Sequence, residues 1–354
     1  MLFRSLMQLT SGFLLAVVAI LYLALFGVLI FRWNAIKNIV VRATSIIVIN
    51  LLLLMSVGMA LNNSYGFYNS WNELFGISTQ GKSVINPSQI DLSKAKYTSN
   101  GSAMLQETFT GNISKITASV WFLIPKSIVA AIKNNSSNKF PVAVFLSGSP
   151  GVPTAWLNGL KLDNQIQQAK GLYALKDFIA VLPDYNIEPH QDTGCMNIPN
   201  GVQVEDWLTS DVYGYVIKNL PAKQNSWVVT GYSTGGWCAS MLAIKHSEIF
   251  KGAAPIAGFY QPEPPLNIIN TIRNTLKQEY DLIKLSKLRS QPVDIFLITS
   301  KADASSYKST NWFYSRIGAG NNVELLTLQS GGHNFTTWRP VVQDVLKWFA
   351  TEFV

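Results

Sequence analysis

The chain has 354 residues, of which 48% are hydrophobic and 14% are charged, and its formal net charge is +8. The hydrophobic excess is local, because residues 1–62 contain no acidic residue and only four basic ones, Arg4, Arg32, Lys37 and Arg42. These four account for half of the net charge, and the rest of the chain has no block of Lys and Arg and no basic stripe interleaved with aromatic residues. The composition therefore argues against nucleic-acid binding.

Two uncharged apolar stretches lie near the N-terminus, at residues 11–31 and 43–61. Each is close to the roughly 20 residues that a helix needs to cross a hydrocarbon layer about 30 Å thick. A cleaved signal peptide is the alternative for the first stretch, but that stretch is long for such a segment, and no small-x-small cleavage pattern precedes the second. We therefore expect residues 1–61 to form a membrane anchor of two transmembrane helices.

The connector between the two stretches, residues 32–42, carries three of the four positive charges. Because positive charge is enriched in cytoplasmic loops, we expect this connector to lie in the cytoplasm. The N-terminus and everything after Leu61 then lie outside the plasma membrane. Residues 62–102 are polar with scattered aromatic side chains, which indicates a juxtamembrane linker or a cover over a site.

The remaining residues, 103–354, alternate between buried strands and helical patterns. We expect strands at 104–110, 113–124, 141–146, 178–182, 227–230, 253–257, 293–299 and 323–328, and helices at 156–169, 204–220, 266–288 and 341–353. This alternation predicts an α/β domain with a mostly parallel sheet that helices cover on both faces. Sites on such sheets lie at the carboxyl ends of the strands. Residues 262–290 are a candidate cap over such a site.

The sequence Gly231-Tyr232-Ser233-Thr234-Gly235 joins the strand at 227–230 to an apolar helix at 238–244. In this setting, G-x-S-x-G is the pattern of a nucleophile elbow, a strained turn that exposes a reactive serine. The motif alone is weak, because a glycine-rich turn with a solvated serine has the same sequence. The strand before it and the helix after it favour Ser233 as a catalytic nucleophile.

A serine hydroxyl needs a base that removes its proton. His333 follows the last predicted strand in a glycine-rich loop and is the preferred base. His246 closes the helix after the elbow, where a cation is favourable at the helix C-terminus. His190 lies in a loop with no strand immediately before it and is the weaker alternative.

The acid that orients the base is expected after a late strand and before the histidine in the chain. Asp303 fits, because it follows the strand at 293–299. The alternative role for Asp303 is to cap the helix that begins near Ser305. Asp294 lies inside the strand and fits poorly, and Asp184 is the second choice.

An oxyanion hole needs two preorganised hydrogen-bond donors. One is expected to be the backbone N–H of Thr234, and the other that of Ser149 or Gly148, in the loop after the strand at 141–146. Pro150 has no N–H and is excluded, and a plain Ser/Gly/Pro turn is the alternative for this loop. The sequence contains no HExxH, CxxC, GxGxxG or P-loop pattern, so we expect neither a metal nor a nucleotide cofactor.

The chain has two cysteines, Cys195 and Cys238. In an intracellular protein, such a pair more often consists of buried free thiols, whereas outside the membrane it indicates a disulfide. The predicted membrane topology therefore favours a disulfide between the loop at 192–197 and the helix behind Ser233.

From about residue 100 onward, the chain resembles the putative-esterase branch of the α/β-hydrolases, which includes esterase D, feruloyl esterases and the antigen 85 mycolyltransferases. The stretches that carry the resemblance are 146–151, 231–236 and 332–335, followed by Trp338. The stretches 192–195 and 204–212, together with Cys238, are similar to those of membrane-anchored, extracytoplasmic actinobacterial esterases. One departure is Ser147-Gly148, where the family usually has histidine-glycine.

The resemblance implies an α/β-hydrolase fold, a triad of Ser233, His333 and Asp303, and a Cys195–Cys238 disulfide. It also implies a serine esterase or acyltransferase that acts on acyl esters, either small molecules or lipids of the cell envelope. The acceptor is open, since both water and a sugar hydroxyl are used within the family. A non-catalytic envelope-binding or scaffold protein and a serine peptidase, each on the same fold, are the alternatives.

Overall fold

The computed structural model describes residues 9–65, 68, 71–75, 90–187, 192–289 and 291–353. The chain forms two compact units, Met1–Thr79 and Gln80–Val354. Part of the linker predicted at 62–102 belongs to the second unit, where residues 92–94 form a 3-10 turn and residues 96–97 an edge strand of the sheet.

Within its described residues, the first unit contains two long apolar helices, α2 (Gly12–Arg32) and α3 (Ile39–Tyr65), and a short helix, α4 (Trp71–Leu74). By length and composition, two segments qualify as candidate membrane spans, Gly12–Arg32 and Ile39–Ser64. The first span is shifted by one residue from the predicted stretch at 11–31 and has the same length, 21 residues. The second, of 26 residues, is longer than the predicted stretch at 43–61, because its helix begins before Arg42 and continues past Leu61.

Several polar side chains in or next to α2 and α3 bond to backbone groups of the same helix. Ser11 caps α2 by accepting a hydrogen bond from the Leu14 N–H at 3.4 Å. The Asn50 side-chain amide donates to the Ile46 carbonyl at 2.8 Å, and the Ser56 hydroxyl donates to the Leu52 carbonyl at the same distance. Such backbone bonding is the way in which a polar side chain is accommodated in an apolar helix.

The second unit is built on a nine-stranded sheet with the order β1-β2-β3-β5-β4-β6-β7-β8-β9. The pairs β1–β2, β2–β3 and β3–β5 are antiparallel, and the other pairs, from β5 across to β9, are parallel. The strands are β1 (Lys96–Tyr97), β2 (Ala103–Thr110), β3 (Thr117–Ile124), β4 (Phe140–Leu146), β5 (Ile179–Pro183), β6 (Ala222–Tyr232), β7 (Phe250–Ile256), β8 (Asp294–Ser300) and β9 (Asn322–Leu328).

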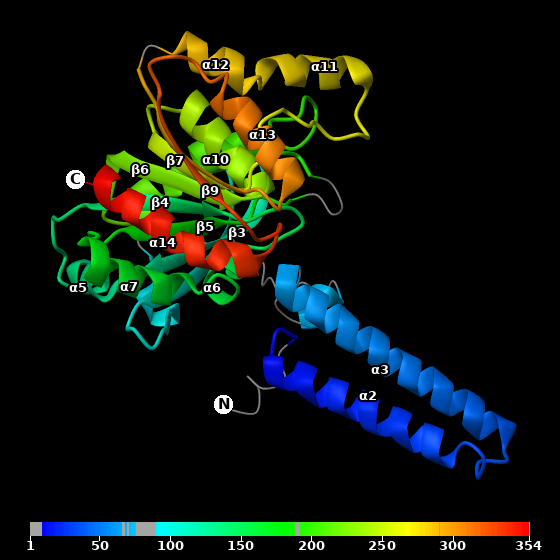
Figure 1. The fold of residues 1–354 in the computed structure, drawn as a ribbon. Helices are drawn as coiled ribbons and strands as arrows, with labels where there is room; N and C mark the ends of the chain where they lie inside the picture. Colours follow the sequence, from blue (N-terminus) through cyan, green and yellow to red (C-terminus); the bar gives the residue numbers. More distant parts are fainter. Residues whose placement is uncertain are drawn as a thin grey trace. The chain divides into compact units, whose positions relative to one another are not determined.

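Helices cover both faces of this sheet (Figure 1). The described helices of this unit are α5 (Lys126–Lys133), α6 (Thr154–Asn158), α7 (Leu162–Tyr173), α8 (Val204–Asp206), α9 (Tyr213–Asn219), α10 (Thr234–Lys245), α11 (Asn270–Glu279), α12 (Leu282–Leu288), α13 (Ala304–Tyr314) and α14 (Phe335–Glu352), with a π-helical turn, η2 (Trp207–Val212), and the 3-10 turn η1 (Leu92–Lys94). Helices α6, α7 and α14 lie on one face, and α10 and α13 on the other.

The central strands are buried on both faces, as a parallel sheet requires. In β4, Val142, Val144 and Leu146 join the core under α10, whereas Ala143 and Phe145 join the core under α14. This alternation follows from the two-residue period of a strand. The prediction of a mostly parallel sheet covered on both faces is therefore confirmed.

Two predicted helices are each divided into two. The helix expected at 156–169 is interrupted at Gly159, where a Cβ would lie 2.5 Å from the Phe335 ring, and by Lys161, whose φ is 58°. The helix expected at 266–288 starts at Asn270 and restarts after Asp281, whose side chain caps α12 by accepting hydrogen bonds from two backbone N–H groups.

Candidate active site

Ser233 lies between the end of β6 and the start of α10, at the carboxyl edge of the sheet. Its φ of 58° and ψ of −125° place a non-glycine residue in a left-handed conformation. Such strain persists only where the surrounding structure enforces it, and it is typical of a nucleophile elbow. The local geometry therefore favours the elbow over a plain glycine-rich turn.

The two glycines of the motif are required by close backbone contacts. A Cβ on Gly231 would lie 2.2 Å from the Gly235 carbonyl oxygen. A Cβ on Gly235 would lie 2.5 Å from the carbonyl oxygens of Leu146 and Ser147. No side chain fits at either position, because backbone atoms close both spaces.

The three predicted triad residues meet at this edge although they are far apart in the chain. The His333 Nε2 lies 2.8 Å from the Ser233 Oγ, and the His333 Nδ1 lies 2.6 Å from the Asp303 Oδ2. The Asp303 side chain is 8% exposed and that of His333 is 32% exposed. The acid is thus buried, whereas the imidazole between it and the serine reaches solvent.

Asp303 makes both of the interactions that the sequence analysis weighed against each other. One carboxylate oxygen accepts from His333, and the other caps α13 by accepting from the Ser306 N–H at 3.4 Å. The two alternative acids lie elsewhere. Asp294 begins β8 and accepts from the Asn322 amide at 2.6 Å, and Asp184 follows β5.

The other two histidines are not in this arrangement. His246 caps the C-terminus of α10 and contacts the carboxylates of Glu205 and Glu248 at 2.6 and 3.0 Å. His190 lies outside the described residues. Among the described histidines, His333 is therefore the one within hydrogen-bond distance of Ser233.

Two aromatic side chains flank the imidazole, Trp338, which is among the residues that carry the family resemblance, and Phe259, for which the sequence analysis made no prediction. The Trp338 ring packs edge-on against the His333 ring, with centroids 4.8 Å apart. The Phe259 ring lies 5.8 Å from the same imidazole. These rings limit the orientations that the base can adopt.

The predicted oxyanion donors stay a prediction, but their surroundings are defined. Thr234 is the first residue of α10, so its N–H has no partner within the helix. A Cβ on Gly148 would lie 3.1 Å from the Ser233 Cβ, which brings the loop that contains Ser149 next to the nucleophile. The Asn186 amide holds this loop by donating to the Gly148 carbonyl at 3.1 Å.

The structure contains the predicted disulfide between Cys195 and Cys238. The same loop is tied to the elbow through Asp192, which accepts from the Thr234 hydroxyl at 2.7 Å and from the Gly194 N–H at 2.8 Å. The Trp237 indole also donates to the Gly194 carbonyl at 2.9 Å. The disulfide therefore fixes a loop that contacts the residue directly after the nucleophile.

Removing the disulfide with the paired change Cys195→Ala and Cys238→Ala is expected to lower the free energy of unfolding by about 3–4 kcal/mol, because the unfolded chain gains loop entropy. Urea unfolding followed by tryptophan fluorescence, on the detergent-solubilised protein, measures this loss. The single change Met196→Leu in the same loop is a control of conserved volume. A loss below about 1 kcal/mol for the pair would contradict the prediction.

Behind the elbow, a second cluster surrounds the buried carboxylate of Glu205. It accepts from the Lys245 ammonium at 3.0 Å and from the Tyr280 hydroxyl at 2.5 Å, and it contacts His246 at 2.6 Å. Burial by itself would raise the pKa of Glu205, but the bonds from these three partners outweigh burial, and the pKa is lowered. Burial likewise acts to lower the pKa of His246, but the bonds to Glu205 and Glu248 raise it.

Glu205→Gln is expected to destabilise the fold by about 3 kcal/mol near pH 6, because it leaves Lys245 and protonated His246 without their buried counter-charge. A carboxylate whose pKa is lowered in the folded protein stabilises the fold at pH values above its unfolded pKa of about 4.3. A histidine whose pKa is raised stabilises the fold at pH values below its unfolded pKa of about 6.5. The difference between wild type and variant in urea midpoint should therefore disappear as the pH falls through the pKa of Glu205. As the pH rises through the pKa of His246, the difference in urea midpoint should shrink only in part, because Lys245 stays charged.

The matched control is Glu248→Gln, which removes the other carboxylate beside His246. The Glu248 side chain is 65% exposed, so its loss is expected to cost less than about 1 kcal/mol. Equal losses for the two variants would contradict a special role for the buried carboxylate.

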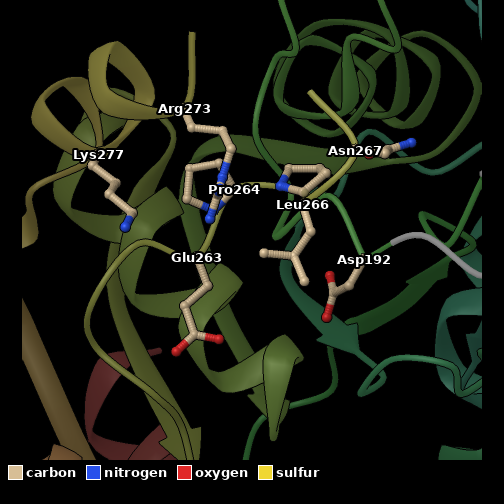
Figure 2. Close-up of a pocket in the computed structure, with 8 residues that line it drawn as sticks. Asp192, Glu263, Pro264, Leu266, Asn267, Arg273 and Lys277 are labelled. Carbon is tan, nitrogen blue, oxygen red and sulfur yellow. The ribbon is translucent and has the colours of Figure 1, made fainter. Parts of the chain in front are cut away.

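Two hollows that share lining residues lie near the elbow. The smaller, here called the elbow hollow, has a volume of about 100 Å³ and is lined by Asp192, Gly194, Thr234, Trp237, Phe259, Gln261 and Glu263. The larger, the α11 hollow, has a volume of about 640 Å³ and is lined by Asp192, Glu263, Pro264, Pro265, Leu266, Asn267, Arg273 and Lys277 (Figure 2). Asp192 and Glu263 line both hollows.

Comparison with solved structures shows the fold. A ferulic acid esterase superposes with a TM-score of 0.61 at 17% sequence identity, over 72% of this chain and 99% of the esterase. An S-formylglutathione hydrolase from Agrobacterium tumefaciens superposes with a TM-score of 0.59 at 14% identity, over 73% of this chain and 98% of the hydrolase. The chain has an α/β-hydrolase fold. The predicted resemblance to esterases of this fold is thereby confirmed.

Sequence comparisons add two matches to this chain. A model of the prolyl oligopeptidase family (Peptidase_S9) matches residues 199–353, which contain the elbow, Asp303 and His333. An uncharacterized protein of Corynebacterium glutamicum is 22% identical over 242 residues, which is 63% of this chain and 55% of the relative. The chain thus spans about half the length of the curated relative that it matches.

Proposed function

We propose that the protein is a membrane-anchored serine hydrolase that cleaves or transfers acyl groups of carboxylic esters through Ser233, His333 and Asp303. The observation that carries the proposal is the unbroken chain of hydrogen bonds from the Ser233 Oγ through His333 to the Asp303 carboxylate, at 2.8 and 2.6 Å. A serine in this arrangement has its proton acceptor in place and that acceptor's tautomer fixed.

In the proposed reaction, the His333 Nε2 takes the Ser233 proton while the Oγ attacks the ester carbonyl. The carbonyl oxygen becomes an oxyanion, which accepts hydrogen bonds from the Thr234 N–H and from the N–H of Ser149 or Gly148. Protonated His333 then gives its proton to the leaving alcohol as the ester bond breaks. Water or an acceptor alcohol attacks the acyl-enzyme by the same steps and restores the serine.

The proposed location rests on the sequence of the first unit and on the disulfide. Both apolar helices have the length of a membrane span, and the connector between them holds Arg32, Lys37 and Arg42. With two spans and a cytoplasmic connector, the hydrolase unit lies outside the plasma membrane. A Cys195–Cys238 disulfide fits such an oxidising compartment.

Hydrolysis of p-nitrophenyl butyrate by the detergent-solubilised full chain tests the proposal, with Ser233→Ala as the blank. We expect wild type to hydrolyse the ester far faster than it hydrolyses spontaneously, and the variant to give no excess over the spontaneous rate. If wild type is folded and its rate equals that of the variant, the proposal fails and the non-catalytic envelope protein becomes the better account.

A serine peptidase is the second candidate, because the matched family model is that of prolyl oligopeptidases. A proline-containing peptide p-nitroanilide, assayed beside the ester, separates the two. Each rate is divided by its own spontaneous rate, since amides are intrinsically less reactive than esters. A larger acceleration for the ester supports the esterase, and a larger acceleration for the anilide supports the peptidase.

A further inference from the structure

The two ends of the α11 hollow carry opposite charges. Asp192 also lines the elbow hollow, whereas Arg273 and Lys277 come from α11, and Glu263 lies below these two cations in Figure 2. In Figure 2 the two cations point down from the helix at the upper left, whereas Asp192 lies at the lower right with the Leu266 side chain between.

The two cations of α11 lack counter-charges within the part of the chain that the structure describes. Neither forms an ion pair with a described carboxylate, and Arg273 donates one side-chain bond, to the Asn270 side chain at 3.3 Å. The Arg273 Nε is buried without a hydrogen-bond partner. Because the residues are four apart, they lie on the same helix face and repel each other. An anion in the hollow would satisfy both.

The wall between the cations and the elbow is apolar. Pro264, Pro265 and Leu266 line the hollow, and the Leu266 side chain is 84% exposed. At the other end, the Asp192 carboxylate accepts from the Thr234 hydroxyl, next to Ser233. The Asp192 carboxylate there repels an anion from the elbow, so a ligand with one charged end is oriented with that end at α11.

We propose that the α11 hollow binds the anionic end, a phosphate or a carboxylate, of an ester substrate whose apolar middle part lies along Leu266. The Arg273 fork and the Lys277 ammonium donate charge-assisted hydrogen bonds to the anionic oxygens. The inference rests on the proposed function for the ester, whereas the anion site itself stands on the hollow and its charges.

Isothermal titration of the full-length Ser233→Ala variant with hexyl phosphate, hexanoate and hexanol tests the site without catalysis. We expect at least one of the anions to bind roughly tenfold or more tightly than hexanol, as hydrogen bonds to charged groups imply. The preference should fall with added salt. Tighter binding of hexyl phosphate than of hexanoate identifies a phosphate group, and the reverse order identifies a carboxylate.

Adding Arg273→Gln and Lys277→Gln together should abolish the preference for the anions over hexanol. The matched control is Lys284→Gln, which removes an exposed cation from the neighbouring helix α12 and should leave the preference intact. Equal binding of anions and alcohol, or a preference that survives the double change, would overturn the inference. Because Ser233→Ala cannot turn over substrate, this result is independent of whether wild type hydrolyses neutral esters, which tests the proposed function separately.

Discussion

Replacing Ser233 with alanine is expected to reduce ester hydrolysis by at least about 10⁴-fold, and His333→Ala by a similar factor. The first change removes the atom that forms the acyl-enzyme, and the second removes the base that lies 2.8 Å from it. Because the two residues act as one unit, the double variant should be little worse than either single variant. The steady-state kcat on a p-nitrophenyl ester is measured for Ser233→Ala, for His333→Ala and for the double variant.

The control for this series is Ser305→Ala, an exposed serine of α13 that contacts neither Ser233 nor His333 in the described structure. It should retain the wild-type kcat. A Ser233→Ala variant with a rate within tenfold of wild type would contradict the nucleophile assignment, whatever the effect of the histidine change.

Asp303→Asn is expected to lower kcat by about 10³–10⁴-fold while the protein stays folded. The carboxylate has one oxygen for the His333 Nδ1–H and another for the Ser306 N–H. An amide has a single acceptor oxygen, so one donor loses its partner or the imidazole adopts the other tautomer, in which Nε2 carries the proton. That tautomer cannot accept the proton of Ser233. Measuring kcat together with the thermal midpoint separates catalysis from folding.

The matched change is Asp294→Asn, at the start of β8, the strand that precedes Asp303 in the chain. The Asp294 carboxylate accepts a hydrogen bond from the Asn322 side chain on β9. This change should leave kcat unchanged. If Asp303→Asn keeps more than a tenth of the wild-type kcat, or if its loss of activity is accounted for by unfolding at the assay temperature, Asp303 is not the orienting acid.

The sequence was sufficient to predict the sheet and the meeting of Ser233, His333 and Asp303. Parallel strands show as continuous apolar runs, and their carboxyl ends share one edge, so polar residues that follow the strands converge there. The glycines of the elbow were informative because backbone atoms fill the space that a Cβ would need, as at Gly235.

The residues around the triad could not be predicted, because their roles depend on contacts over long sequence separations. Phe259 and Trp338 flank the imidazole from separate segments, and Asn186 holds a loop 35 residues earlier at Gly151. A single sequence gives no spacing rule for such contacts. Asp192 had a weaker signal, its place in the cysteine loop, but its bond to Thr234 appears only in the fold.

Element boundaries were missed where one side chain decides them. Lys161 in a left-handed conformation ends one helical pattern, and the Asp281 cap starts α12 inside another. Both patterns have the apolar spacing of a continuous helix, so periodicity does not reveal the break.

The central claim is that Ser233 is activated by His333. Labelling the detergent-solubilised full chain with a fluorophosphonate, followed by peptide mapping, tests it most directly. The account predicts one label per chain, on Ser233, and no label on His333→Ala or Ser233→Ala. A folded wild-type protein that stays unlabelled at neutral pH, or a label on another serine, would contradict it.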